Sequence, residues 1–321
     1  MSYLPQRVTS RIEGKILYNE PLRNHTTWRI GGPADVFIEP ASRKDIALLL
    51  EFARENNQPV TVIGNGSNLL VSDNGLKGVV IKIGDALGHV RIVEEKLIAE
   101  AGAKLGRVTA IAQAAGLGGL EFAVGIPASI GGAVTMNAGA NGAAMADVVD
   151  TVTVMDYQAR EHVLSAADLD FGYRTSRLQR LEAVVVEIEL RLAPCDPLEI
   201  RRRSEEYLRR RRVTQPLDSP SAGSVFKNPP GEAAGRLIEL AGAKGLRVGD
   251  AVVSEKHANF IINAGKAKSE DVLLLIGRVR EMVRDKFGIE LELEVKVIGN
   301  SGAGWLDAIC HQGSKPLAGS D

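Results

Sequence analysis

Apolar residues first recur at helical spacing in the segment from about Arg43 to Asn57. This spacing predicts a helix there, and Ser42 is suited to be its N-cap. The apolar face of the predicted helix consists of Ile46, Leu49, Leu50 and Ala53. A short apolar run, residues 60–63, follows the helix and predicts a strand that leads directly into a Gly-rich loop.

Shorter apolar runs separated by Gly or charged residues follow from residue 79 onward. They predict a second α+β unit of several strands and one helix, which ends at Gly116. In the last of these strands Val184, Val186, Ile188, Leu190 and Leu192 alternate on one face. The predicted strands cover residues 79–83, 90–93, 97–101, 148–156 and 183–192, and the predicted helix covers residues 105–115.

A change in pattern near Pro194 and Pro197 indicates a boundary, after which an Arg-rich helix leads into a third unit. Two further helices are predicted at residues 232–241 and 269–287. The last predicted strand, residues 290–298, alternates apolar with charged positions. Its charged face carries Glu292, Glu294 and Lys296.

Composition and charge restrict the class of protein. At 321 residues the chain is long enough for two or three packed units, and its net charge of -1 gives no overall field to attract nucleic acid or an anionic membrane. Cys195 and Cys310 are far apart, so neither a disulfide framework nor a metal cluster is expected. Without a signal-like apolar run or a stretch of membrane-spanning length, we expect a cytoplasmic protein.

Two Gly-rich loops are the candidate ligand sites, one beginning at Gly64 and the other running from Gly125 to Ala140. The backbone N–H groups of both loops are unobstructed by side chains, as a pyrophosphate site requires. Neither loop has the spacing of a Rossmann fingerprint or a P-loop. Taken singly, such a loop is more often a plain turn, but two long ones in one chain favour ligand binding.

An Arg-rich run between Glu199 and Arg212 contains seven Arg and three Glu. A solvated helix with i,i+4 ion pairs is preferred over nucleic-acid binding, because no aromatic stacking platform accompanies the run. The five His residues lack metal-ligand spacing, and no G-x-S-x-G motif indicates a serine hydrolase.

Several motifs occurring in order resemble those of the UDP-N-acetylenolpyruvoylglucosamine reductase (MurB) family. The resemblance extends from about Asn24 to Gly299, and the ordered set is more specific than any single motif. The motifs are Asn24–Asp35, Gly64–Leu70, Gly125–Ala140, Phe171–Ser176, Ala222–Pro229 and Leu291–Val295.

The resemblance implies an α+β fold, with a two-part FAD-binding domain of the vanillyl-alcohol-oxidase/PCMH type and a C-terminal α+β substrate domain. The corresponding boundaries are 1–76 and 77–196 for the two FAD-binding subdomains, 197–298 for the substrate domain and 299–321 for a tail. The residues that match the flavin-binding motifs are Gly64, Asn65, Gly66, Ser67, Asn68, Leu69, Gly125, Ile126, Pro127, Ser129, Ile130, Gly131, Gly132, Ala133, Asn137 and Gly139.

The implied activity is NADPH-dependent reduction of the enolpyruvyl group of a UDP-sugar in peptidoglycan precursor synthesis. In the family, hydride passes from NADPH to FAD and then from flavin N5 to the sugar, and a serine protonates the resulting carbanion. Ser224 matches that proton donor, while Arg174 and Glu294 match the other catalytic residues. The implied substrate contacts are Tyr173, Lys227 and Asn228.

The chain departs from some family members in one place. It has no tyrosine-bearing insertion after the arginine motif and therefore resembles the shorter subtype. Tyr157, Tyr173 and the helix at residues 201–212 are candidates to cover the UDP-sugar. Alternation alone does not separate Glu294 from Glu292, and two other functions stay open: another FAD-linked oxidoreductase, and a flavin- or nucleotide-binding protein without catalysis.

Overall fold

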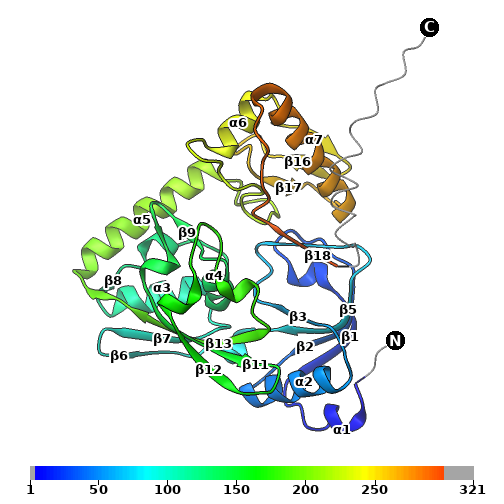
Figure 1. Ribbon diagram of the computed structural model, residues 1–321. Helices are drawn as coiled ribbons and strands as arrows, with labels where there is room; N and C mark the ends of the chain where they lie inside the picture. The colour runs from blue at the N-terminus through cyan, green and yellow to red at the C-terminus, as the bar shows by residue number, and fades with distance from the viewer. Residues whose placement is uncertain (1–3, 300–321) are drawn as a thin grey trace. The chain divides into compact units, whose positions relative to one another are not determined.

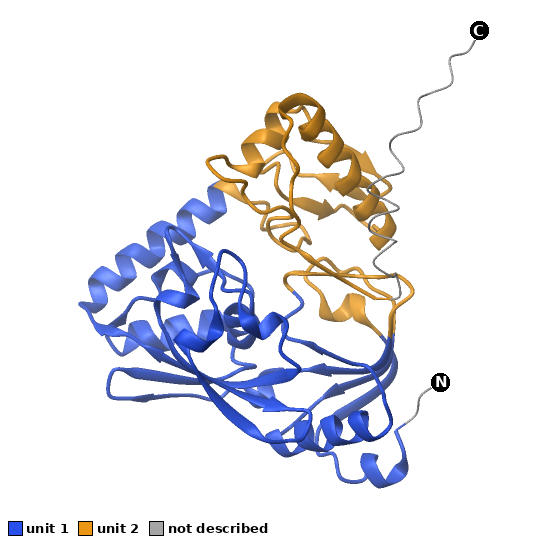
Figure 2. Cartoon of the chain, viewed as in Figure 1, with its two compact units in different colours: residues 1–20, 34–66, 77–213 blue, residues 21–33, 67–76, 214–321 orange. Residues whose placement is uncertain are grey.

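The described chain, residues 4–299 of a computed structural model, folds into two compact units (Figure 2). Unit 1 contains the described residues up to 20 together with 34–66 and 77–213. Unit 2 contains 21–33, 67–76 and the described residues from 214 onward. The predicted tail, with Trp305 and Cys310, lies outside the described residues apart from Gly299.

A four-stranded sheet forms the first part of unit 1, with the strand order β1-β2-β5-β3 (Figure 1). Strands β3 and β5 are parallel, and Val60 is opposite Val79. The strands are β1 (Lys15–Pro21), β2 (Pro33–Glu39), β3 (Val60–Ile63) and β5 (Leu76–Lys82), and the helices that accompany them are α1 (Gln6–Thr9) and α2 (Arg43–Glu55).

Helix α2 confirms the first predicted helix and its N-cap. The Ser42 side chain accepts a hydrogen bond from the Asp45 amide. Asp45 is itself fully buried, and its carboxylate accepts the amides of Glu13, Gly14 and Ala41. A carboxylate buried with these donors satisfies its lone pairs, so it fixes the chain before the helix.

The second part of unit 1 is a five-stranded antiparallel sheet with the order β12-β11-β13-β7-β6. The predicted alternation in β13 is confirmed, since Val184, Val186, Ile188 and Leu190 are buried. The strands are β6 (Val90–Val93), β7 (Lys96–Glu100), β11 (Val149–Asp156), β12 (Glu161–Ser165) and β13 (Ala183–Arg191). The helices of this part are α3 (Leu105–Ala114), α4 (Ile130–Thr135) and α5 (Pro197–Thr214), and two short pairs join β8 (Leu117–Gly118) to β14 (Ala193–Pro194) and β9 (Gly139–Ala140) to β10 (Ala143–Ala144).

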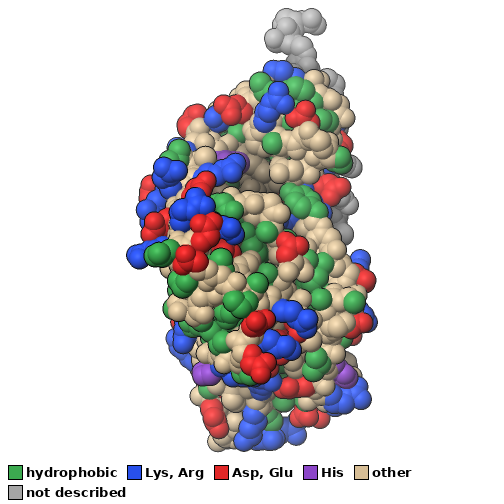
Figure 3. Space-filling model, turned by 90° about the vertical axis from the view of Figure 1, so that its left-hand side faces the viewer, with side chains coloured by type: hydrophobic (Ala, Val, Ile, Leu, Met, Phe, Trp, Pro, Cys, Tyr) green, Lys and Arg blue, Asp and Glu red, His purple; other side chains and the backbone are tan. Residues whose placement is uncertain are grey.

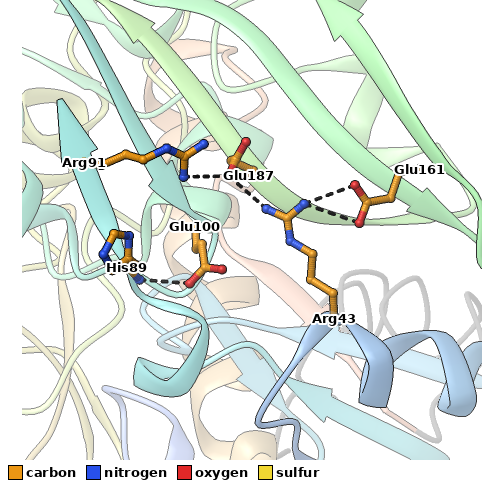
Figure 4. A network of polar contacts seen from close by, with 6 residues as sticks. All are labelled: Arg43, His89, Arg91, Glu100, Glu161 and Glu187. Carbon is orange, nitrogen blue, oxygen red and sulfur yellow. Dashed lines mark hydrogen bonds and ion pairs between the residues drawn. The ribbon is translucent and has the colours of Figure 1, made fainter. Parts of the chain in front are cut away.

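An ion-pair network links α2 to the five-stranded sheet within unit 1 (Figure 4). The Arg43 guanidinium lies 2.9 Å from Glu187 of β13 and 3.1 Å from Glu161 of β12. Arg91 of β6 contacts the same Glu187 oxygen at 3.2 Å. One hydrophobic core continues through both sheets, from Ile38 of β2 to Ile188 of β13. Apolar packing therefore joins the two sheets, and the arginines add oriented polar contacts.

Unit 2 has its own core, which includes the fully buried Trp28. The Trp28 indole donates to the Ile261 carbonyl at 2.8 Å, which ties the segment 21–33 to the C-terminal part of the chain. The helices are α6 (Ala234–Leu240) and α7 (Ser269–Phe287). The strands form a sheet of β15 (Arg247–Val248), β16 (Ala251–Val253) and β17 (Ile261–Asn263) and a parallel pair of β4 (Leu69–Val71) and β18 (Lys296–Ile298).

The last predicted strand is wrong in extent, because only β18 is regular within residues 290–298. The chain changes partner there. Leu293 pairs with Phe226 in an isolated antiparallel bridge, and from Lys296 the chain pairs with β4 instead. The alternating pattern reflects two short pairings, which local spacing does not distinguish from one long strand.

Gly75 joins two backbone segments of unit 2 at very close range. Its φ is +76°, and a β-carbon there would lie 1.8 Å from the Pro33 carbonyl oxygen. We predict that Gly75→Ala lowers the free energy of unfolding of unit 2 by more than about 2 kcal/mol, from strain plus overlap. The control is Gly242→Ala, at a φ of +83° with nothing within 4 Å, for which strain alone predicts about 1 kcal/mol. Guanidinium unfolding measures the free energy of unfolding of both variants. Equal decreases would contradict the close approach of Gly75 to Pro33 as the cause.

Candidate active site

The two Gly-rich loops meet within unit 1. The Asn65 side-chain amide donates to the Pro127 carbonyl at 2.6 Å. A β-carbon on Gly64 would lie 2.3 Å from the Ser129 hydroxyl oxygen. Residue 64 must therefore be small for the loops to approach each other this closely, which is a packing reason for the first glycine of the motif.

The second loop is held from two sides. Gly125, with a φ of +75°, lies against Leu208 and Arg211 of α5, and burial lowers the pKa of Arg211. At the start of α4 the amides of Ile130 and Gly131 donate to the carbonyls of Ala103 and Ala101. These two amides are thus engaged in hydrogen bonds within the protein.

Arg174 lies at the tip of a tight turn in unit 1. Gly172 and Thr175 exchange backbone hydrogen bonds at its base, and Arg174 has a φ of +59°. The Arg174 guanidinium donates to the Gly139 carbonyl at 2.9 Å and lies 5.1 Å from the centre of the Tyr173 ring. A left-handed non-glycine residue is uncommon and persists only where its surroundings fix it.

Two amide side chains fix this turn. Asn137 donates to the Gly172 carbonyl at 2.9 Å and accepts the Ala146 amide. The Gln179 side chain donates both to the Arg174 carbonyl at 3.0 Å and to the Thr135 carbonyl at 3.1 Å. The sequence predicted a role for Asn137 but gave no signal for Gln179, because its partners are backbone carbonyls.

In unit 2, Ser224 and Glu294 lie on adjacent backbone segments. The Glu294 amide donates to the Val225 carbonyl at 2.8 Å, and the Lys227 amide donates to the Glu292 carbonyl at 2.8 Å. The segment after Ser224 is therefore hydrogen-bonded directly to the segment that contains Glu294. Two predicted catalytic residues that are distant in sequence thus share one local framework.

Asn68 holds Glu294 from another direction. Its side chain donates to the Glu294 carbonyl at 3.1 Å, and its own carbonyl accepts the Lys296 amide. Leu69 begins β4, which pairs with β18. Of the first predicted flavin motif, Gly64 to Gly66 therefore belong to unit 1, whereas Ser67, Asn68 and Leu69 belong to unit 2.

The structure distinguishes the two glutamates that alternation left equivalent. Glu292 is 76% exposed and forms an ion pair with Lys227 at 3.2 Å, whereas Glu294 is half-buried. Burial and the charge of Lys227 lower the pKa of Lys296. Glu294 is thus the less solvated carboxylate near Ser224.

Asn228, another predicted substrate contact, accepts the Ala234 amide at the start of α6 and so also has a structural contact.

The residues of unit 1 fit a bound FAD. Small and polar side chains line the place where the loops meet, and Gly132 has only the Ser129 hydroxyl within 4 Å of a notional β-carbon. Asn65, Ser129 and Asn137 are neutral hydrogen-bonding residues of these loops, and Asn137 connects its loop to Gly172. Such a donor set suits a large neutral ring system joined to a pyrophosphate.

The remaining surface features agree with a solvated protein face. Hydrogen bonds from Arg202 and Arg203 lower the pKa of Glu199 to about 2, and Arg201 pairs with Glu205. Lys and Arg side chains are interspersed with Asp and Glu on the face drawn in Figure 3. Between residues 4 and 299, no cluster of three or more His, Cys, Asp or Glu side chains is arranged to hold a metal ion, and no helix is long and apolar enough to cross a membrane.

Comparison with known proteins decides the family. A family profile described as the C-terminal domain of UDP-N-acetylenolpyruvoylglucosamine reductase matches residues 215–298, and one described as an FAD binding domain matches residues 34–165. A UDP-N-acetylenolpyruvoylglucosamine reductase from Desulforamulus reducens is 48% identical over 92% of this chain and 98% of its own length. The chain belongs to the UDP-N-acetylenolpyruvoylglucosamine reductase family.

Other MurB proteins agree with this assignment. The reductase from Moorella thermoacetica is 52% identical over 89% of this chain and 94% of its own length. The crystal structure of the Thermus caldophilus MurB matches with a TM-score of 0.77 and 40% identity, covering 90% of this chain and all (100%) of that one. The predicted family, the α+β fold with an FAD-binding domain, and the FAD cofactor are thereby confirmed.

The contact between Gly64 and Ser129 predicts a specific coupling in FAD binding. We expect Gly64→Ala to weaken FAD affinity about tenfold, because the added methyl group forces the two loops apart, a change of about 1.4 kcal/mol. In a Ser129→Ala background the overlapping oxygen is gone, so the same substitution should cost much less. Fluorescence titration of the apoprotein with FAD measures the FAD affinity of wild type, of the two single variants and of the double variant. An equal cost in both backgrounds would contradict the proposed contact.

Proposed function

We propose that this chain catalyses the NADPH-dependent reduction of UDP-N-acetylglucosamine enolpyruvate to UDP-N-acetylmuramate in peptidoglycan precursor synthesis. Membership of the MurB family supports the proposal. Bound FAD would supply the hydride carrier between NADPH and the enolpyruvyl group. The partner is thus a small-molecule UDP-sugar, without nucleic acid or membrane, and the expected location is the cytoplasm.

The observation that carries the proposal is the shared framework of Ser224 and Glu294. Hydride addition to the terminal alkene carbon leaves a carbanion next to the substrate carboxylate, and that carbanion needs a proton. Ser224 is the proposed donor. An ordinary hydroxyl is a weak acid, so it needs polar neighbours held at fixed distances. The hydrogen bond between Glu294 and Val225, at 2.8 Å, supports that requirement.

Arg174 is the proposed partner of the substrate carboxylate. The planar guanidinium fits a carboxylate in a bidentate manner, and its charge stabilises the enediolate-like species formed on hydride addition. The hydrogen bonds from Asn137 and Gln179 to its turn support a fixed orientation. Tyr173, beside it and 52% exposed, is the proposed cover of the UDP-sugar, whereas Tyr157 packs against the core of unit 1.

The proposed FAD-binding residues remain those of the two Gly-rich loops. Gly64, Asn65 and Ser129 are supported by the contact between the loops. Ile130 and Gly131 would contribute through packing, since their amides donate within the protein. Lys227 and Asn228 stay proposed substrate contacts in unit 2. The two FAD-binding subdomains at residues 1–76 and 77–196 also stay a proposal, although residues 21–33 and 67–76 belong to unit 2.

We predict that Ser224→Ala leaves flavin reduction by NADPH nearly intact and slows flavin reoxidation by the sugar by about 100-fold or more. The reason is that only the second half-reaction requires the proton from the hydroxyl. Ser221→Ala, in the same loop, is the matched control and should retain both rates. Anaerobic stopped-flow absorbance separates the two half-reactions. Equal slowing of both in Ser224→Ala would remove Ser224 from the donor role.

Arg174→Lys tests the requirement for a planar cation. We expect turnover to fall by about 100-fold while flavin content changes little, because lysine offers a point charge but still reaches a carbonyl acceptor. Arg177→Lys, in the same segment and exposed, is the control and should retain activity. Steady-state NADPH oxidation with the enolpyruvyl UDP-sugar measures turnover. Near-normal turnover in Arg174→Lys would assign the arginine a structural role only.

A further inference from the structure

Ser224 lies two residues before the isolated bridge at Phe226, in a segment that belongs to none of the sheets in the described chain. Gly223 before it has a φ of +77°, and nothing lies within 4 Å of a notional β-carbon at that glycine. Ala222 before it is buried in the core of unit 2, but Gly223 itself has no side chain to pack. The position of the Ser224 hydroxyl therefore depends also on what holds Val225 and Phe226 after it.

One side of this segment is held by the chain around Leu293. Phe226 faces Leu293 in an antiparallel bridge, flanked by the hydrogen bonds from Lys227 to Glu292 and from Glu294 to Val225. In such a pair the N–H and C=O of Phe226 point away from the partner strand. Phe226 is buried, at 2% exposure, so both groups need partners on the other side.

Asn259 supplies those partners. Its side-chain oxygen accepts the Phe226 amide at 2.9 Å, and its side-chain nitrogen donates to the Phe226 carbonyl at 2.8 Å. Its own carbonyl accepts the Val225 amide at 2.8 Å. Asn259 is only 3% exposed. Its backbone amide donates to His257 Nδ1 at 3.2 Å, and this bond restrains Asn259 in turn. One residue thus takes the place of a neighbouring strand.

We infer that Asn259 is a positioning residue for the proton-transfer step, because its paired hydrogen bonds to Phe226 fix the backbone that carries Ser224. This inference rests on the proposed function of Ser224. The contacts of Asn259 with Val225 and Phe226, here called the clamp, hold the two residues that directly follow Ser224. They therefore set the placement of Ser224 from its C-terminal side. Misplacement of a reacting group by about 1 Å costs on the order of 100-fold in rate.

Asn263 provides a matched control four residues further on. It is also buried, and its side chain donates to the Trp28 carbonyl and accepts the amides of Gly265 and Ala267. Its side chain therefore stabilises the same unit without contacting Ser224, Val225 or Phe226, and its backbone hydrogen bond to the Pro220 carbonyl is kept in an alanine variant. Asn259→Ala and Asn263→Ala should both lower the unfolding midpoint, but only Asn259→Ala should slow the proton-dependent step.

The measurement uses the full-length FAD-loaded proteins. For Asn259→Ala we expect reoxidation by the enolpyruvyl UDP-sugar to slow by about 10- to 100-fold. Flavin reduction by NADPH and the calorimetric Kd of the sugar should change less than about threefold, and the solvent deuterium isotope effect on reoxidation should rise. Asn263→Ala should keep wild-type reoxidation. Similar slowing in both variants would overturn the positioning role and leave a structural one.

Asn259→Asp retains the shape and keeps the inference testable if the alanine variant does not fold. The carboxylate accepts the Phe226 amide, but only the protonated carboxyl also donates to the Phe226 carbonyl. Burial raises the pKa of a carboxyl group, so the protonated form gains population as pH falls. Relative to wild type, the reoxidation rate of Asn259→Asp should therefore rise about tenfold from pH 8 to pH 5.5.

Other titratable groups near the clamp are His257, which contacts Asn259, and Lys227 and Glu292, which flank Phe226. These groups are present in every variant. Dividing the reoxidation rate of a variant by that of wild type at the same pH therefore cancels the effect of their titration. Asn259→Ala should give a flat ratio over the same pH range. A flat ratio for Asn259→Asp as well would overturn the paired hydrogen bond as the cause.

Failure of the proposed function is distinguishable from failure of this inference. If the wild-type flavin is not reoxidised by the sugar, the reductase proposal fails whatever Asn259 does. The clamp is then tested by amide hydrogen exchange in Asn259→Ala, which should be at least tenfold faster at Phe226 than in wild type, because that amide loses its side-chain acceptor. Unchanged exchange at the Phe226 amide would refute the clamp itself.

Discussion

The arrangement of unit 2 depends on the need to satisfy buried backbone groups in a segment too short to form a sheet. Val225 and Phe226 are buried with their N–H and C=O groups, and the chain near Leu293 pairs with only one side of them. Asn259 pairs with the other side. The bonds that satisfy Phe226 hold the backbone next to Ser224, and the bond from the Glu294 amide to the Val225 carbonyl joins Glu294 to the same backbone. Folding and the proposed proton transfer therefore rely on neighbouring contacts.

Unit 1 meets a different constraint, which is the close approach of loops from two separate sheets. Gly64 permits contact with Ser129, and Asn65 crosses to the Pro127 carbonyl. The turn that presents Arg174 is anchored to the same region through Asn137 and Gly139. The loop that fits FAD and the arginine proposed to bind the substrate carboxylate therefore share their support. A change in either is expected to affect the other.

The spacing of apolar residues predicted the elements in which that spacing is regular within one segment. Helix α7 (Ser269–Phe287) has the predicted bounds because it buries one face along its whole length. Strand β3 (Val60–Ile63) also has the predicted bounds, although only Ile63 in it is buried. What periodicity missed depends on contacts between distant segments. The hydrogen bond from Trp28 to Ile261 joins residues 21–33 to the C-terminal part of unit 2, and the ion pair with Lys227 is made by the exposed Glu292 rather than by Glu294. Asn259 and Gln179 act on backbone groups and leave no spacing pattern in the sequence.

The central claim is that the chain reduces an enolpyruvyl UDP-sugar through FAD, and an anaerobic titration tests it most directly. NADPH is added to the FAD-loaded protein while the flavin absorbance is followed, and the enolpyruvyl UDP-sugar is added after bleaching is complete. The account predicts bleaching by NADPH and then recovery of the absorbance in proportion to the sugar added, with UDP-N-acetylmuramate as the product. Bleaching without recovery would contradict the proposed substrate and favour another FAD-linked oxidoreductase, and a flavin that NADPH does not bleach would contradict the reductase itself.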